Sequence, residues 1–377
     1  MNTTTYALPK NSQAWHDALF KVAHLLSDVH HTMLKDLPIF AITVVVNRSV
    51  LSSENSGIEL LDEAMNRYMV NLSKWHLQMV YDDEAAKQAA DKIVAGMTLA
   101  DVVVSRYLLL PNDPEQMTKS KQEAAARIID EQLTHHLKQC FSSDDGKDAV
   151  DVHILNINQV LTAPKLVCFD MDSTLIEQEV IVELARMCGL ADKVSEITES
   201  AMRGEIDFAE SFAKRVALLE NVPESVVGEI IQKHITIQPG AFAVIRALKT
   251  LGATTVLVSG GFEPFAQHVA QTLGMDEFHA NPLLVADGKL TGLTDSNILD
   301  GKQKALIVER TANRMGINLD EVVCVGDGAN DLPMMAVSGT GIAYKAKPIV
   351  AAKADAAVNI TGLEGVLYAL GHRFDKV

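Results

Sequence analysis

The chain has 377 residues, 48% of them hydrophobic and 22% charged, so it is long enough for two or three domains and can bury a core. Its formal net charge of −16 disfavours nucleic acid and anionic membrane as partners, because both attract basic surfaces. The four cysteines have no CxxC or other metal-binding spacing, which indicates reduced thiols in a cytoplasmic protein. No apolar signal core opens the chain, and no run approaches about 18 consecutive apolar residues, so neither secretion nor membrane spanning is expected.

Residues 1–160 carry no chemical motif, but they alternate strand-like and helix-like patterns. Runs rich in β-branched and aliphatic residues predict strands, and apolar residues at three- and four-residue intervals predict helices. The expected order is strand, helix, strand, helix, strand, at residues 40–46, about 58–80, 100–110, about 115–140 and 150–155. These patterns indicate a small α+β domain that ends at a short connector near Pro164.

The stretch LVCFDMDSTL at 166–175 is an apolar run suited to a buried parallel strand, and it stops at two carboxylates, Asp170 and Asp172. Ligands of open α/β sheets bind outside the carboxyl ends of such strands. Two anions this close raise the pKa of one of them unless a cation neutralises them, so the stretch calls for a metal ion, a proton or both. The alternative is a strand-ending turn whose carboxylates only bind nearby backbone N–H groups.

Two later apolar runs also end in polar groups flanked by glycine. Residues 254–258 end at Ser259-Gly260-Gly261, and residues 321–325 end at GDGAND, which contains Asp327, Asn330 and Asp331. Helical patterns closed by glycine separate the runs, and this repetition of strand and helix predicts a right-handed parallel sheet. All three polar ends then meet along one edge of the sheet, which makes the turn interpretation less favourable.

Those strand ends contain the parts of a phosphoryl-transfer site. Ser259-Gly260-Gly261 precedes a helix and offers a hydroxyl and free backbone N–H groups to a phosphate. Asp327 and Asp331 add carboxylate oxygens of the kind that Mg²⁺ binds. Lys304 is a candidate for the positive charge, with an ordinary surface lysine as the alternative. A nucleophilic aspartate, a second aspartate as acid and base, and Mg²⁺ complete a site that works through an aspartyl-phosphate.

Four short motifs resemble those of the haloacid dehalogenase phosphatases: FDMDSTL at 169–175, SGGF at 259–262, Lys304, and GDGANDLPM at 326–334. Residues 164–370 are similar, more specifically, to the bacterial phosphoserine phosphatases. Three further blocks carry that similarity, AMRGEIDFAESFAKRV at 201–216, ANPLLVADGKLTG at 280–292 and GIAYKAKP at 341–348. The resemblance implies hydrolysis of O-phospho-L-serine to serine and phosphate, the last step of serine biosynthesis.

The resemblance also implies a role for each matching position. Asp170 corresponds to the nucleophile and Asp172 to the general acid and base. Mg²⁺ would be held by the Asp170 carboxylate, the Asp172 backbone carbonyl and Asp327, with Asp331 in its outer shell. The groups that would bind the phosphoryl group are Ser259, the Gly260 amide and Lys304, with Asn330 nearby. Glu179 and Arg215 match the residues that hold the ammonium and carboxylate of the substrate.

The interval 178–238 is mostly helical and too long for a βα loop, so it is expected to form a cap over the strand ends. A free amino acid needs one anion and one cation in its pocket, and an arginine fork matches a carboxylate, which suits Glu179 and Arg215. Their alternative is a solvated helix face. We therefore predict an α/β enzyme with a Rossmann-like core at 165–177 and 239–377, a helical cap, and an N-terminal α+β domain. Some family members carry an ACT-like domain there, and residues 1–160 loosely fit that pattern.

Two other functions are compatible with these patterns. One is a phosphatase or phosphotransferase that acts on another small phosphorylated amino acid or alcohol. The other is a binding protein in which residues 1–160 sense an amino acid and the second half is a vestigial enzyme, although the complete set of Asp170, Asp172, Lys304 and Asp327 argues against it. An amino-acid effector of the N-terminal domain and a homodimer are further hypotheses.

Overall fold

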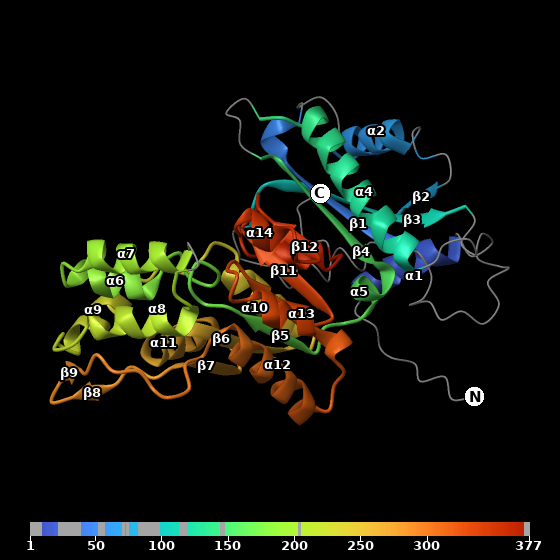
Figure 1. Ribbon diagram of the computed structural model, residues 1–377. Helices are drawn as coiled ribbons and strands as arrows, with labels where there is room; N and C mark the ends of the chain where they lie inside the picture. Colours follow the sequence, from blue (N-terminus) through green and yellow to red (C-terminus); the bar gives the residue numbers. More distant parts are fainter. Residues whose placement is uncertain are drawn as a thin grey trace.

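The computed structural model describes residues 10–21, 39–51, 57–69, 72, 75–81, 99–112, 119–143, 148–202 and 205–372. Within these ranges, no helix combines the length and the apolar character that crossing a membrane would require. Figure 1 shows three groups of elements: an N-terminal sheet with its helices, a central parallel sheet, and a group of helices at one side.

The N-terminal region, residues 10–161 as described, contains a four-stranded antiparallel sheet of order β2-β3-β1-β4. Its strands are β1 (Phe40–Asn47), β2 (Trp75–Met79), β3 (Val102–Pro111) and β4 (Val150–Asn156). Its helices are α1 (Lys10–Lys21), η3 (Arg48–Val50), α2 (Gly57–Met69), α4 (Lys119–Cys140) and α5 (Ile157–Leu161). The order β1-α2-β2-β3-α4-β4 is that of a ferredoxin-like fold, so the expected N-terminal α+β unit is confirmed.

One sequence prediction in this region is wrong. The helix expected from 58 to 80 ends at Met69, and strand β2 follows at Trp75–Met79. The apolar residues Trp75, Leu77 and Met79 alternate with polar ones, which is the period of a strand, and they pair with β3. The second helix was expected from about 115; residues 113–118 lie outside the described residues, and α4 is helical from Lys119 to Cys140.

Both faces of this small sheet are covered. Phe40, Ile42 and Val44 of β1 point to the face that packs against α2 and α4. Ala41 and Val45 point to the opposite face, where they belong to the same hydrophobic cluster as Trp15 of α1 and residues of the C-terminal helix α15 (Gly365–Ala369). The N-terminal sheet therefore shares a continuous core with the C-terminal end of the chain.

The central sheet is parallel, with six strands in the order β12-β11-β10-β5-β6-β7. Its strands are β5 (Leu166–Phe169), β6 (Thr254–Phe262), β7 (Glu277–Asn281), β10 (Val322–Gly326), β11 (Thr340–Tyr344) and β12 (Ala356–Val358). The elements around it are α10 (Ala241–Thr250), α11 (Glu263–Leu273), α12 (Gly301–Met315), η5 (Leu319–Glu321), α13 (Leu332–Val337) and α14 (Pro348–Ala351). Alternate residues of β5 enter two different clusters, Val167 and Phe169 on one face and Leu166 and Cys168 on the other. This burial on both faces explains the continuous apolar runs and confirms the predicted parallel sheet.

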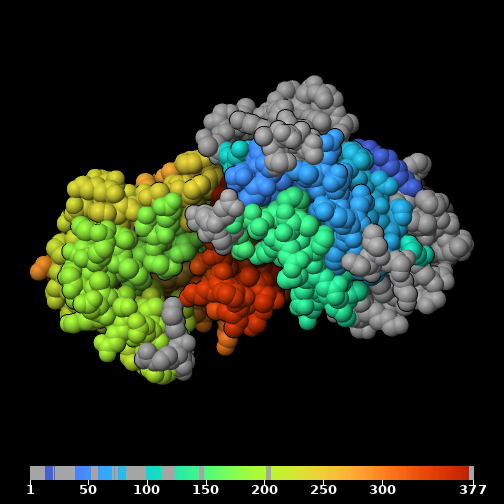
Figure 2. Space-filling view, turned by 90° about the horizontal axis from the view of Figure 1, so that it is seen from above, coloured from blue at the N-terminus to red at the C-terminus, as the bar shows by residue number. Residues whose placement is uncertain are grey.

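The cap consists of four helices inserted after β5: α6 (Val180–Met187), α7 (Ala191–Met202), α8 (Phe208–Ala217) and α9 (Ser225–Lys233). The chain enters and leaves it side by side, since Ile176 and Ile237 form an isolated antiparallel bridge. A small hairpin, β8 (Val285–Ala286) with β9 (Lys289–Leu290), reaches the cap through a bridge between Pro223 and Lys289. In Figure 2 the cap forms one lobe and the N-terminal region another, with the C-terminal part of the core between them.

The junction between the N-terminal region and the core is built on residues 359–372. The Asp151 carboxylate on β4 accepts hydrogen bonds from the Asn359 backbone N–H at 2.8 Å, the Asn359 side-chain amide at 3.0 Å and the Ile360 N–H at 3.1 Å. The side chains of Trp15 and Arg106 both donate to the Gly371 carbonyl, at 3.1 and 2.9 Å. Residues 359–372 therefore connect the N-terminal region to the central sheet by hydrogen bonds.

Candidate active site

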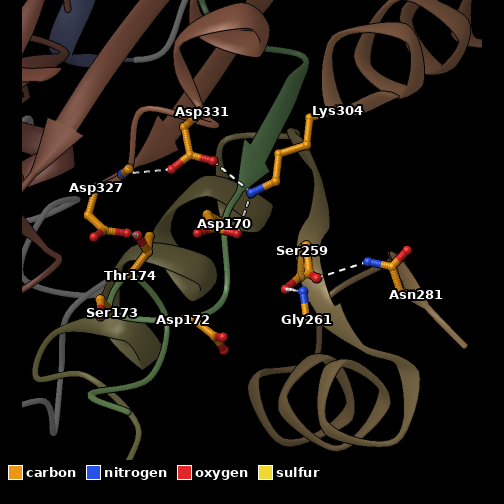
Figure 3. A network of polar contacts seen from close by, with 12 residues as sticks. Asp170, Asp172, Ser173, Thr174, Ser259, Gly261, Asn281, Lys304, Asp327 and Asp331 are labelled. Carbon is orange, nitrogen blue, oxygen red and sulfur yellow. Dashed lines mark hydrogen bonds and ion pairs between the residues drawn. The ribbon is translucent and has the colours of Figure 1, made fainter. Parts of the chain in front are cut away.

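Three strand ends converge on one edge of the central sheet. Strand β5 lies between β10 and β6, and Phe169 pairs with Val325 on one side and Leu257 on the other. The Asp170 N–H donates to the Val325 carbonyl at 2.9 Å, so the ladder continues as far as the first carboxylate. Asp170 therefore lies next to the segments that carry Ser259 and Asp327, as Figure 3 shows.

Lys304 brings a buried positive charge to this edge. Helix α12 begins at an N-cap, Asp300, whose Oδ1 accepts the Gln303 N–H at 2.8 Å, and one turn later the Lys304 side chain is 0% exposed. Its Nζ donates to Asp170 Oδ1 at 2.5 Å and to Asp331 Oδ1 at 2.7 Å. Burial lowers the pKa of Lys304, but the charges of Asp170 and Asp331 outweigh burial and hold that pKa above its ordinary value. The surface-lysine alternative is wrong.

Lys304 lies beside an acidic cluster. Carboxylate oxygens of Asp170, Asp327 and Asp331 all lie within 4.8 Å of one another. Burial and the charge of Asp331 raise the pKa of Asp170 to about 8, and the same two causes raise the pKa of Asp327 to about 7. One lysine thus leaves three carboxylates under-neutralised, which is the electrostatic condition that a divalent cation relieves.

The hydrogen bonds of the cluster show which carboxylates are available to a cation. Asp331 uses one oxygen for Lys304 and the other for the Gly328 N–H at 2.9 Å. Asp327 has only a long contact of 3.4 Å from the Thr174 hydroxyl among the bonds of the described residues. Asp170 and Asp327 are therefore the better ligands, while Asp331 is held by the protein itself, and the donor set fits a hard divalent cation.

Asp172 occupies a different environment from Asp170. Its Oδ2 accepts the Val180 N–H at 3.3 Å, and its Oδ1 is buried without a hydrogen-bond partner in the described part of the chain. Burial, followed by the charges of Glu179 and Asp170, raises the pKa of Asp172 well above its usual range. A carboxyl group with a raised pKa holds its proton more firmly, which suits a general acid.

The Ser259-Gly260-Gly261 segment forms the other wall. Ser259 is buried, and its Oγ accepts the Gly261 N–H at 2.9 Å, just before α11 begins. Gly260 approaches the cap closely, since a Cβ added there would lie 3.1 Å from Phe208 Cζ of α8. A larger residue at 260 would push this part of the cap away.

The two residues expected to hold the amino-acid group come from the cap side. Glu179 is the residue before α6, and its Oε1 accepts the Ser173 hydroxyl at 2.9 Å. Burial lowers the pKa of the Arg215 guanidinium on α8, while the charges of Glu179 and Asp172 act to raise it. The Arg215 guanidinium is therefore close enough to the Glu179 and Asp172 carboxylates to interact with their charges. Arg215 belongs to the similarity block AMRGEIDFAESFAKRV at 201–216, of which residues 203 and 204 lie outside the described residues.

Asn330 lies in the turn between β10 and α13. Its Oδ1 packs against Gly328, since a Cβ added to Gly328 would lie only 2.2 Å from that oxygen. Sequence reasoning did not single out three other residues at this edge. Thr174 contacts Asp327, Ser173 contacts Glu179 with a left-handed φ of 58°, and Asn281 contacts the Gly260 carbonyl. Thr174 and Ser173 belong to the DMDST motif and could have been found there, whereas Asn281 belongs to the similarity block ANPLLVADGKLTG at 280–292, to which no role was attached.

Comparisons with known proteins agree with this geometry. A family model described as haloacid dehalogenase-like hydrolase matches residues 164–339. A probable phosphoserine phosphatase of Schizosaccharomyces pombe is 44% identical over 289 residues, which cover 73% of this chain and 95% of that relative. This chain belongs to the phosphoserine phosphatase family of haloacid dehalogenase-like hydrolases. The family inferred from the motifs is confirmed.

Further relatives extend the same comparison. The phosphoserine phosphatase of Streptomyces coelicolor is 41% identical over 244 residues, which cover 65% of this chain but only 59% of that longer protein. A haloacid dehalogenase family hydrolase from Salmonella enterica serovar Typhi has a TM-score of 0.66 and 26% identity over 88% of this chain and 98% of its own. A structure described as a phospho-aspartyl intermediate analogue of phosphoserine phosphatase has a TM-score of 0.51 and 42% identity, covering 54% of this chain and 97% of its own. The α/β family fold is therefore confirmed.

Proposed function

We propose that this chain hydrolyses O-phospho-L-serine to L-serine and phosphate through a phospho-aspartyl intermediate, and that this reaction is the last step of serine biosynthesis. The observation that carries the proposal is the buried Lys304, which bridges Asp170 and Asp331 beside the Ser259 segment. Such an arrangement holds a nucleophilic carboxylate next to a fixed positive charge, as phosphoryl transfer needs. The relatives named phosphoserine phosphatase support the choice of substrate.

Asp170 is the proposed nucleophile, attacking phosphorus in line with the departing seryl oxygen. The Lys304 ammonium, the Ser259 hydroxyl and the Gly260 N–H bind the phosphoryl oxygens and stabilise the charge that develops on them, with Asn330 nearby. The carboxylates of Asp170 and Asp327 and the backbone carbonyl of Asp172 would hold Mg²⁺, which supplies further neutralisation of the phosphoryl oxygens. Asp331 keeps Lys304 in place from the outer shell.

Asp172 is the proposed general acid and base. Its raised pKa keeps a proton ready for the seryl oxygen as the phosphoester bond breaks. Once it has lost that proton, the same carboxylate takes a proton from the water that cleaves the aspartyl-phosphate. Both transfers use one group because the leaving alcohol and the attacking water occupy the same side of the phosphorus in turn.

The substrate's amino-acid group is assigned to Glu179 and Arg215. Glu179 pairs with the ammonium and the Arg215 fork with the carboxylate, and the closed cap keeps bulk water away until serine has left. The nearness of Glu179 to Asp172 also helps to keep Asp172 protonated when the site is empty.

The division into an N-terminal domain at 1–160, a core at 165–177 and 239–377 and a cap at 178–238 stays a prediction. So do a cytoplasmic location, a homodimer, and an amino-acid effector of the N-terminal domain. The shared core between the N-terminal sheet and α15 supports a regulatory role, because it gives that domain a fixed contact with the catalytic half.

The test is the isosteric variant Asp170→Asn. We expect phosphoserine turnover to fall by more than about a thousandfold, because the amide is no nucleophile. Acid quenching with ³²P-labelled phosphoserine should label the wild type on a carboxylate and leave the variant unlabelled. Activity near that of the wild type in a folded Asp170→Asn protein would reject the assignment. Transfer of label to an added alcohol such as homoserine would identify a phosphotransferase instead.

A further inference from the structure

The Ser259-Gly260-Gly261 segment leaves the β-ladder in a bulge. Strands β6 and β7 pair at Val258 opposite His279 and again at Phe262 opposite Asn281, so the three residues 259–261 face the single residue Ala280. A bulge of this kind re-aims side chains next to active sites, and it takes backbone groups out of the ladder. Those groups need other partners, because buried N–H and C=O groups are rarely left unpaired.

Asn281 supplies the missing partner. The residue is 3% exposed, its Nδ2 donates to the Gly260 carbonyl at 2.8 Å, and its Oδ1 accepts the Leu299 N–H at 2.7 Å. Leu299 immediately precedes Asp300, the N-cap of the helix that carries Lys304. One amide thus joins the bulged segment to the start of α12. Only an amide fits this position well, because it offers a donor at one end and an acceptor at the other.

The contact with Gly260 fixes the direction of the next N–H group. The Gly260 carbonyl and the Gly261 N–H belong to one planar trans peptide and point in opposite directions. With the carbonyl held by Asn281, the Gly261 N–H points at Ser259 Oγ, 2.9 Å away, as Figure 3 shows. The hydroxyl oxygen accepts that bond, so its own hydrogen is left to donate to another group.

We propose that Asn281 is a positioning residue for phosphoryl binding: it orients the Ser259 hydroxyl as a donor and sets the spacing between the Ser259 segment and Lys304. This inference rests on the proposed function, since the group that receives the Ser259 hydrogen is the substrate's phosphoryl oxygen. Both polar ends of the Asn281 side chain bind protein groups, the Gly260 carbonyl and the Leu299 N–H. Its effect passes through the peptide that joins Gly260 to Gly261 and through the first turn of α12.

The first test is Asn281→Asp, which replaces the donor facing the Gly260 carbonyl with a carboxylate oxygen. Losing a donor that stabilises transition-state charge costs about a hundredfold or more in kcat, and a displaced donor costs part of that. We therefore expect kcat to fall about ten- to a hundredfold, KM to change much less, and inorganic phosphate to inhibit more weakly. Asn281→Gln, which keeps the amide, should recover part of the rate; a wild-type kcat for Asn281→Asp would overturn the proposal.

The second test asks whether the effect passes through Ser259. Asn281→Asp should cost much less in a Ser259→Ala protein than in the wild type, because the hydroxyl that it orients is already gone. Fully additive losses in the double variant would overturn the orienting role proposed for Asn281, because they would show that it acts independently of the Ser259 hydroxyl. This cycle compares active proteins, so it remains informative if Asn281→Asp also lowers the melting temperature.

The matched control lies on β6, the strand that carries Ser259, but at its opposite end. Thr255 is buried on β6, and its hydroxyl donates to Asp276 at 3.0 Å, far from the bulge. Thr255→Val should lower the melting temperature and leave kcat unchanged; an equal fall in kcat would assign the effect of Asn281 to general loosening of the sheet, against the proposal. Failure of the proposed function looks different, since Asp170→Asn would then stay active whatever the Asn281 variants do.

Discussion

The catalytic edge and the junction between the N-terminal region and the core both bury ionisable groups, but they balance the charges in different ways. At the edge, Asp170, Asp327 and Asp331 share one lysine, and burial leaves two of the carboxyl pKa values near neutrality. At the junction, Asp151 receives three hydrogen bonds from the core, and Arg106 donates to a carbonyl and lies 5.6 Å from the centre of the Trp15 ring. At the junction, neutral protein groups hydrogen-bond to each charge, whereas the edge retains an excess of negative charge that a cation and a phosphate site can use.

The two regions should also respond to pH in opposite directions. Raised carboxyl pKa values at the metal-free edge mean that the folded protein holds protons which the unfolded chain releases, so stability falls as pH rises toward 8. At the junction, burial and the charge of Arg106 lower the pKa of His372 to about 4, and burial lowers the pKa of His153. In the unfolded chain these two histidines bind protons, whereas in the folded protein they stay neutral, so stability falls as pH drops below about 6.5.

The largest effect is expected for Lys304→Met, which removes the positive charge that pairs with Asp170 and Asp331. Leaving the buried Asp170 and Asp331 carboxylates unpaired costs about 3–5 kcal/mol of stability at neutral pH, and turnover should fall more than about a thousandfold. Denaturant unfolding and phosphoserine turnover measure the two losses. Adding Asp331→Asn should restore stability without restoring turnover; a double variant less stable than Lys304→Met would show that the lysine is not the neutralising charge.

The next effect concerns His372 at the junction. Replacing it with glutamine removes a group that takes up a proton on unfolding below about pH 6.5, so the loss of stability on acidification should become shallower. The difference in slope approaches about 1.4 kcal/mol per pH unit between pH 6 and pH 4.5. Urea unfolding at a series of pH values gives both slopes, and His268→Gln on α11, a histidine away from the junction, is the matched control. Identical slopes for the wild type and His372→Gln would contradict the buried neutral state of this histidine.

A smaller effect is expected for Asp151→Asn. The amide presents an N–H group in place of one carboxylate oxygen, so one of the three hydrogen bonds that Asp151 accepts is replaced by two donors that face each other. Bonds to a charged acceptor are worth about 1.5–3 kcal/mol each, so the junction should lose about 2 kcal/mol. The kcat per folded molecule should stay the same, because Asp151 bonds to the segment after β12, and β11 separates β12 from β10 and β5, which carry the catalytic carboxylates. Melting followed together with kcat checks both statements; a fall in kcat would show that docking of the N-terminal region controls the site.

The contrast also explains how much the sequence could reveal. Strands β5, β6 and β10 were predictable because burial on both faces gives unbroken apolar runs, and their polar ends then had to meet at one edge. The junction was not predictable, because Asp151 lies in β4, where polar and apolar residues alternate and a polar residue normally faces water, and Arg106 is a lone charge in the largely apolar run of β3. The docked C-terminal segment covers both residues, and the Trp15 ring also covers Arg106. The similarity block at 280–292 contains Asn281, but its role could not be predicted, because its partners depend on a bulge that the local sequence does not indicate.

The smallest effect, and the sharpest contrast with the junction, concerns metal and pH together. A divalent cation bound by Asp170 and Asp327 displaces protons that these carboxyls hold when metal is absent, so it binds more tightly as pH rises. The gain in melting temperature from Mg²⁺ over EDTA should therefore be a few degrees larger at pH 8 than at pH 5.5. Asp327→Asn should reduce this pH-dependent gain, while Asp151→Asn should leave it intact. An equal gain at both pH values would mean that the acidic edge is already deprotonated without metal, and the electrostatic difference between the two regions would disappear.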